Sequence, residues 1–249
     1  MTARPARRAG RWLAGAAVVL AALLAAIVLA RGGAEKPAPR PPAERPTLLL
    51  LTSLPLLFGE TLSLEGGGSP ALTALETRYR VVPIAVARMS ELRKGSLLLM
   101  AHPLAQPAEA LVELDAWVRR GGRVVLLADP ALEWDSALPL GDRRRPPPTF
   151  ADTGLLAHWG LRLDAPDERG PRQGEIGGRT VMTVSPGSLT GRGCALETRG
   201  LVAHCRLGKG QATIIADADF LNLDDLDGPT ADNLPALLAE LSRIEKDRP

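Results

Sequence analysis

The residues from Gly121 to Pro130, GGRVVLLADP, constrain the fold of this chain more than any other segment. Five consecutive apolar residues, 124–128, lie between a glycine pair and Asp129-Pro130, a pattern typical of a strand that is buried on both faces. The preceding residues, 107–120, carry apolar side chains at helical spacing, with a proline at the expected start and Gly121 at the expected end. A helix followed by a buried strand is half of a right-handed crossover unit, so the sequence predicts a parallel sheet.

Other segments extend the predicted sheet. Residues 48–51, 80–85 and 96–101 are largely apolar and are expected to be further strands of the parallel core. The segments from residue 180 onward are expected to form an antiparallel extension at its edge: 180–184, 194–198, 201–207 and 211–216. A final amphipathic helix is predicted over 233–246. The predicted fold class is therefore α/β, a mostly parallel sheet flanked by helices with an antiparallel C-terminal extension.

The first residues of the chain predict export from the cytoplasm. Four arginines precede an apolar run over 12–30, and Arg31 follows it closely. At about 1.5 Å per residue, a helix of this length covers the roughly 30 Å hydrocarbon core of a bilayer, and the excess of positive charge before it places the N-terminus in the cytoplasm. A cleavable signal peptide is the alternative, because Val28-Leu29-Ala30 provides small residues at a plausible cleavage site.

These observations predict four regions and a location. The regions are a basic cytoplasmic tail over 1–11, a transmembrane anchor over 12–30, a Pro-rich linker over 31–46 and a periplasmic α/β domain over 47–246. The expected protein crosses the bacterial inner membrane once, through Trp12 to Ala30, with its N-terminus in the cytoplasm and most of the chain in the periplasm.

The composition excludes several classes of function. Lys and Arg total 30 against 28 Asp and Glu, aromatic residues make up 3%, and no basic stripe carries stacking side chains, so nucleic acid is not an expected partner. The sequence contains no Gly-x-Ser-x-Gly elbow, Walker loop, His-Glu-x-x-His or Cys-x-x-Cys motif. We therefore predict no cofactor and no metal site, and we assign no residue a catalytic role.

The two cysteines are expected to face each other across a hairpin. If Arg199-Gly200 is the centre of the turn, Cys194 lies opposite Cys205. Outside the cytoplasm such a pair can form a disulfide that fastens the hairpin. Free buried thiols are the alternative, because this pairing puts both residues at a hydrogen-bonded position, where the side chains diverge somewhat more.

Polar residues lie at or just after the carboxyl ends of the predicted strands. They are Glu60, His102, Asp129, Asp217 and Asp219, with Asn222 close behind. In an open α/β sheet these ends meet at one crevice, where such a set can bind a divalent ion or a sugar, or act as an acid and base pair. The structural alternative is that the aspartates cap turns and His102 is a satisfied loop histidine. Glu60 has the least obvious structural role.

Two long stretches have no periodic pattern. Residues 164–178 are polar and glycine-rich and are expected to be irregular. Residues 131–150 contain Arg143 to Arg145 and Pro146 to Pro148, and connections of this length are usually functional or mobile. A binding module should show an apolar patch beside this proline-rich loop, whereas an enzyme should gather the polar residues in one concave pocket with shifted pKa values.

Two blocks of the sequence resemble a known bacterial family. Residues 102–130 and 208–222, followed by Asp232-Asn233-Leu234, are similar to a domain of unknown function shared with the auxiliary component of gliding-motility-type ABC transport systems. The resemblance implies a flavodoxin-like fold, similar to class I glutamine amidotransferases but without their catalytic cysteine, and a membrane-anchored protein. It assigns no reaction.

The sequence leaves three hypotheses about function. The first is a membrane-anchored, non-enzymatic accessory domain that binds a partner protein or a small polar ligand at the carboxyl edge of the sheet; its assignment to an ABC-type transport or envelope system comes from the resemblance alone. The alternative is a periplasmic hydrolase that acts on a glycan or a similar polar substrate through Glu60, His102 and Asp129. A purely structural scaffold is the third.

Overall fold

The computed structural model describes residues 37–58 and 68–246. The chain divides into two units, Met1–Glu35 and Lys36–Pro249, and the described residues belong to the second. Within them, every helix is too short or too polar to cross a lipid bilayer. We therefore withdraw the predicted transmembrane helix and the single-pass inner-membrane location; the segment to which they referred, 12–30, lies outside the described residues, as does Glu60.

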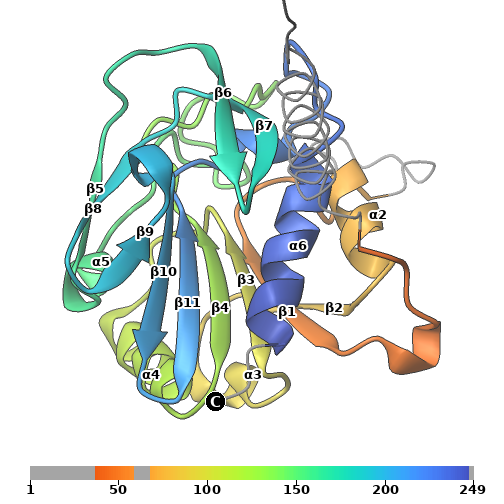
Figure 1. The fold of residues 1–249 in the computed structure, drawn as a ribbon, viewed down its shortest axis with the longest axis vertical. Helices are drawn as coiled ribbons and strands as arrows, with labels where there is room; N and C mark the ends of the chain where they lie inside the picture. Colours follow the sequence, from red (N-terminus) through yellow and green to blue (C-terminus); the bar gives the residue numbers. More distant parts are fainter. Residues whose placement is uncertain (1–36, 59–67, 247–249) are drawn as a thin grey trace, which may run out of the picture. The chain divides into compact units, whose positions relative to one another are not determined.

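A seven-stranded mixed sheet forms the centre of the domain (Figure 1), with the order β2-β1-β3-β4-β11-β10-β9. The strands are β1 (Thr47–Thr52), β2 (Arg80–Pro83), β3 (Leu97–Ala101), β4 (Arg123–Leu127), β9 (Cys194–Leu196), β10 (Val202–Leu207) and β11 (Gly210–Ile215). The first five in the sheet order are parallel, and β10 is antiparallel to both of its neighbours. Two small antiparallel sheets lie outside it: β5 (Leu161–Asp164) with β8 (Ser188–Gly191), and β6 (Pro171–Ile176) with β7 (Arg179–Val184).

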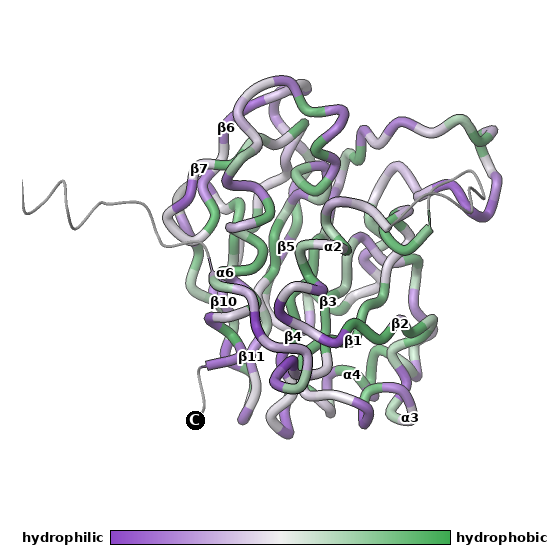
Figure 2. The backbone as a smooth tube through the Cα atoms, turned by 90° about the vertical axis from the view of Figure 1, so that its right-hand side faces the viewer, coloured by the Kyte–Doolittle hydropathy of each residue, from purple (hydrophilic) through white to green (hydrophobic). Residues whose placement is uncertain are grey.

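The predicted neighbours at the centre of the sheet are confirmed. Residues 48–52 of β1 pair with 97–101 of β3, and 97–101 pair with 123–127 of β4, all in parallel register. All five residues of β3 and the last four of β4 are buried, because helices cover both faces of the sheet. The strongly hydrophobic colour of β1 in Figure 2 reflects the same pattern in its four central leucines.

The predicted fold class was wrong in how it placed the C-terminal strands. The sheet is mixed, and β11 is parallel to β4, although we predicted it as part of an antiparallel extension. Its residues are almost all buried, which suits an interior position between β4 and β10 better than a place at an edge. β7 was predicted as a strand, but it does not join the main sheet. It pairs with β6, which lies within the stretch 164–178 that we predicted to be irregular.

Five α-helices accompany the sheet within residues 37–58 and 68–246: α2 (Pro70–Glu76), α3 (Met89–Leu92), α4 (Ala108–Arg119), α5 (Leu155–His158) and α6 (Asn233–Lys246). α2 and α6 cover one face and α4 covers the other (Figures 1 and 2). α4 buries Leu114, Trp117 and Val118. The Trp117 ring lies directly over Gly122, where a Cβ atom would be 2.3 Å from the ring, so this close approach requires glycine.

The last residues of the predicted linker are part of the fold. Arg40 forms an ion pair with Glu245 of α6 at 3.0 Å, and its guanidinium lies 5.4 Å from the centre of the Tyr79 ring. The backbone N–H of Arg40 donates to the Thr77 carbonyl, and Arg78 donates to the carbonyl of Ala38. The chain is thus held against the domain before β1 begins.

Candidate functional site at the carboxyl edge of the sheet

Four of the predicted site residues gather at the carboxyl edge of the sheet. His102 directly follows β3, Asp129 comes two residues after β4, and Asp217 comes two residues after β11. Asp219 begins the short 3₁₀ helix η3 (Asp219–Leu221). These three strands are neighbours, and carboxylate oxygens of the three aspartates lie within 4.8 Å of one another. We call Asp129, Asp217 and Asp219 the acid cluster.

Each aspartate of the acid cluster holds a loop through its backbone. Asp129 accepts hydrogen bonds from the N–H groups of Ala131 and Ala218, both at 2.8 Å. Asp217 accepts from the N–H of Phe220 at 2.9 Å, and Asp219 accepts from the N–H of Glu133 at 2.9 Å. The predicted capping role is therefore present, and it ties two loops together across the edge of the sheet.

The acid cluster is closed to solvent and has no cationic partner in the part of the chain that the structure describes. Its side chains belong to residues that are 0%, 0% and 1% exposed, and none of the three forms an ion pair with a described residue. Burial raises the pKa of Asp129 to about 6; burial and the charge of Asp129 raise the pKa of Asp219 to about 8. Burial and both neighbouring carboxylates raise the pKa of Asp217 well above its ordinary value.

These pKa shifts predict that stability rises as the pH falls. Each folded-state pKa lies above the unfolded value, so the folded chain binds more protons, and the resulting stability is lost as the pH rises through the folded pKa. With a pKa of about 8 for Asp219, the free energy of unfolding should increase by about 1 kcal/mol between pH 8.5 and pH 7. Urea unfolding in the presence of a chelator measures this change.

The matched control for this prediction is Asp219→Asn, which should have a flatter profile over the same pH range because the titration of Asp219 is removed. Asparagine keeps an acceptor for the N–H of Glu133 but does not titrate. His102 acts in the opposite direction only near and below pH 6.5, because burial lowers its pKa and the unfolded chain then takes up the proton. A wild-type profile that is flat or falls toward pH 7 would contradict the prediction.

His102 holds the long connection over the edge of the sheet. The residue is 0% exposed, its φ angle is 45°, and its Nε2 lies 2.8 Å from the Pro147 carbonyl, to which it donates as the neutral tautomer. Burial lowers its pKa, so the neutral form is favoured. The prediction of a satisfied loop histidine holds for Nε2 only, because Nδ1 is buried without a hydrogen-bond partner among the described residues.

Residues 131–150 fold back over the carboxyl edge as a roof, and we use this name for them below. Both ends of the roof are hydrogen-bonded to Asp129. The N–H of Phe150 donates to the Asp129 carbonyl, and the N–H of Ala131 donates to the Asp129 carboxylate. Within it, the N–H of Leu132 donates to the Pro148 carbonyl at 3.0 Å. The predicted open crevice is therefore filled by the chain itself.

A groove runs along the outside of the roof. Its volume is about 420 Å³, and its lining is mostly apolar: Leu104, Leu132, Trp134, Leu140, Pro146, Pro147 and Pro148, with Gly141, Asp142, Arg143 and Arg145. Leu140 is 83% exposed and Leu104 is 52% exposed. This is the apolar patch beside the proline-rich loop that a binding module was expected to show.

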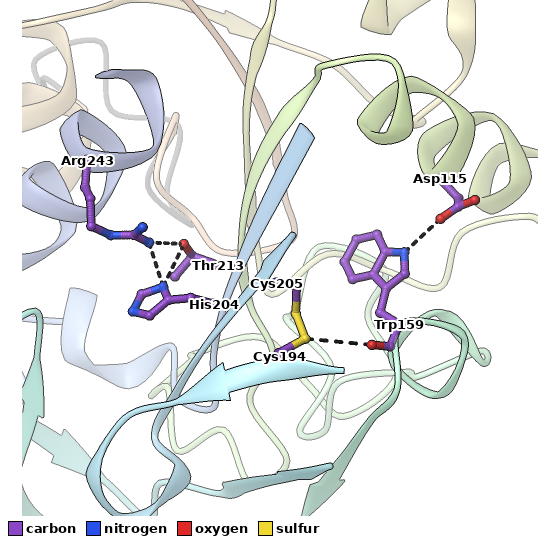
Figure 3. The surroundings of a disulfide bond; sticks show 7 residues. All are labelled: Asp115, Trp159, Cys194, His204, Cys205, Thr213 and Arg243. Atoms are coloured by element: carbon purple, nitrogen blue, oxygen red, sulfur yellow. Dashed lines mark hydrogen bonds between the residues drawn. A yellow bond between two sulfur atoms is a disulfide. The ribbon is translucent and has the colours of Figure 1, made fainter. Parts of the chain in front are cut away.

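The predicted cysteine pairing is present at the far edge of the sheet. Cys194 of β9 pairs with Cys205 of β10 in register, and a disulfide joins them (Figure 3). Trp159 lies beside this bridge and donates from Nε1 to Asp115 of α4 at 2.9 Å. The cysteines therefore have a structural role, fastening the edge of the sheet.

A second polar cluster near the disulfide was not predicted. His204 accepts at Nδ1 from Arg243, which also donates to Thr213 (Figure 3). His204 donates from Nε2 to Glu197 at 2.8 Å, and Arg243 also donates to Glu240. Two glutamates and a histidine can bind a metal, but here the guanidinium of Arg243 supplies the positive charge. The network joins α6 to β10 and β11, and no sequence pattern connects residues so far apart.

No protein-family model and no curated protein sequence matches the chain. The similar solved structures include an exo-β-1,4-mannosidase from Opitutaceae bacterium strain TAV5 (14% identity, TM-score 0.47, 81% of this chain and 36% of that one). They also include a β-galactosidase from Bacillus circulans sp. alkalophilus (15%, 0.46, 83% and 32%) and a cytoplasmic protein from Salmonella typhimurium (10%, 0.48, 80% and 98%). The chain spans about a third of these two glycoside hydrolases. At such TM-scores the likenesses establish neither a family nor an activity. The expected role in ABC transport comes from the sequence resemblance alone, and we do not retain it.

Proposed function

We propose that this domain is a non-enzymatic binding module whose groove holds an apolar, acidic-flanked segment of a partner protein. The single observation that carries the proposal is the groove on the outside of the roof, with its exposed leucines beside a half-buried tryptophan. That the chain belongs to the bacterial family of unknown function is likewise a proposal, supported by the sequence resemblance.

The apolar part of the groove has the composition of a protein-binding surface. Five large hydrophobic side chains are exposed among the described residues. Two of them, Leu104 and Leu140, line this groove. Leu132 and Trp134 are partly buried against the core, so the floor of the groove is fixed while its rim is open. An aromatic anchor with exposed aliphatic neighbours is a common centre of binding energy in protein interfaces.

The charges in the groove favour an acidic partner. Arg143 and Arg145 both line it, and Arg143 is exposed. Asp142, the acidic member of the lining, is already paired with Arg144 at 2.8 Å. The remaining potential is positive, so aspartate or glutamate beside the apolar anchor of a partner would be complementary in charge.

A display library of random peptides tests this proposal. The wild-type domain should enrich peptides with apolar residues flanked by acidic ones, and fluorescence anisotropy should then show at least about tenfold weaker binding of such a peptide to Trp134→Ala. Arg143→Glu should also weaken binding, more strongly at low salt.

The matched control is Val112→Ala. Val112 is 69% exposed on α4, outside the groove, so its truncation should leave peptide affinity unchanged. If no peptide is enriched, or if Trp134→Ala binds the enriched peptide as well as the wild type does, the groove is not the binding site.

A glycan hydrolase is the second candidate function, favoured by the raised pKa values within the acid cluster. A protonated Asp219 beside an ionised Asp129 would supply an acid and a carboxylate, the pair that glycoside hydrolysis uses. Their burial requires the roof to move before a substrate can reach them. Release of nitrophenol from chromogenic glycosides, lost in Asp219→Asn, would support this function; no release above the buffer rate by the wild type would exclude it for those substrates.

A further inference from the structure

The acid cluster is more than a set of loop caps. Its three aspartates come from the ends of adjacent strands, are 0%, 0% and 1% exposed, and bring carboxylate oxygens within 4.8 Å of one another. Among the described residues no lysine, arginine or histidine pairs with them. Three carboxylates in so small a buried volume require either protons or a cation.

Two carboxylate oxygens in the cluster are left without a partner. Asp217 uses Oδ1 to accept from Phe220, and the N–H of Val184 also interacts with this carboxylate, but no donor reaches the buried Oδ2 at hydrogen-bonding geometry. Asp219 uses Oδ2 to accept from Glu133, and its Oδ1 is buried and unpaired. A buried acceptor without a partner is costly, by roughly 1–3 kcal/mol and more for a charged group. The capping role therefore accounts for one oxygen of Asp217 and one of Asp219, and leaves the second oxygen of each for a ligand.

The donor set defines the chemistry of that ligand. Carboxylate oxygens are hard donors, which suit calcium, magnesium or manganese. The closed position of the cluster favours calcium, because magnesium dehydrates reluctantly and usually keeps several waters, whereas calcium is bound by protein oxygens in flexible geometry. A divalent cation would also neutralise two of the three buried charges.

We propose that Asp129, Asp217 and Asp219 bind a divalent cation, with calcium preferred, at the carboxyl edge of the sheet. The unpaired oxygens of Asp217 and Asp219 are its ligands, and Asp129 completes the carboxylate set. Because Asp129 and Asp219 also hold the N–H groups of Ala131 and Glu133, the cation fixes the start of the roof. The site goes beyond the proposed binding function and does not depend on it.

Calorimetric titration of the chelator-treated, dialysed full chain with calcium, magnesium and manganese chlorides tests the site. The wild type should bind one calcium ion per chain and unfold at a higher temperature in its presence. Asp217→Asn should bind calcium at least about tenfold more weakly, as expected when a carboxylate ligand is lost. Asp219→Asn should show the same loss.

The controls separate a specific site from general attraction of cations. Asp135→Asn removes an exposed carboxylate in the roof and should leave calcium affinity unchanged. Both cluster variants keep an amide oxygen for their backbone donors, so they should fold, and circular dichroism checks this. The proposal is overturned if the wild type binds none of the three cations, or if the folded Asp217→Asn and Asp219→Asn proteins bind calcium as tightly as the wild type. Peptide binding at the groove is a separate readout, so failure of either proposal leaves the other standing.

Discussion

Asn233→Ala is expected to lower the free energy of unfolding by about 4 kcal/mol. Asn233 is 0% exposed at the start of α6, and its amide makes three hydrogen bonds. The side-chain oxygen accepts from the N–H of Met182, and Nδ2 donates to the carbonyls of Met182 and Phe220, all at 2.8 to 2.9 Å. Alanine leaves three buried backbone groups unpaired, at roughly 1–3 kcal/mol each before relaxation.

The loss at Asn233 should also disturb the candidate site. Phe220 follows Asp219 in η3, so this amide holds the loop of the acid cluster against α6 and β7. Urea unfolding measures the loss of stability. The control is Asn222→Ala, whose side chain bonds only to exposed Asp225 in the described structure and should change stability by less than about 0.5 kcal/mol. Equal effects of the two substitutions would contradict the assigned role of Asn233.

Reduction of the Cys194–Cys205 disulfide is expected to lower the free energy of unfolding by about 3 kcal/mol. The bridge closes a chain segment with a sequence separation of 11 and joins β9, the edge strand, to β10. In the chain-entropy view, opening such a loop releases conformational freedom in the unfolded state. Urea unfolding with and without a thiol reductant measures the change.

The double variant Cys194→Ala with Cys205→Ala is the control for reduction. Its stability should be low in both conditions and insensitive to the reductant. Reduction should leave the acid cluster intact, because the hydrogen bonds described for the cluster involve residues of neither β9 nor β10. A wild-type unfolding curve that does not move with reductant would contradict the prediction.

The strands of the central sheet could be predicted from the sequence because they are continuous apolar runs, a pattern that indicates burial on both faces. The apolar run 124–128 could only be a core strand or a buried helix segment, and its flanking glycines and Asp129-Pro130 decided between them. It did not predict the direction of β11, because an apolar strand has the same pattern in either direction. It also missed β6, whose residues PRQGEI are mostly polar and become a strand only by pairing with β7.

Part of the candidate site could also be predicted, because its aspartates directly follow buried strands. The positions of Asp129, Asp217 and Asp219 after three buried strands led to their convergence, because parallel strands end at one edge. The roof was not predicted as a lid over them, since its backbone bonds to Asp129, Asp219 and His102 leave no periodic signal in 131–150. Asn233 was missed because its partners are 13 and 51 residues away.

A roof tied to buried aspartates closes the carboxyl edge of the sheet, and the proposed binding groove is lined by this roof. Amide hydrogen exchange at Ala131, Glu133 and Ala218 tests it most directly, because these N–H groups donate to the acid cluster. We predict slow exchange in the wild type and faster exchange at Ala131 and Ala218 in Asp129→Ala. Exchange of these amides in the wild type at the rate of fully exposed groups would show an open edge and contradict the account.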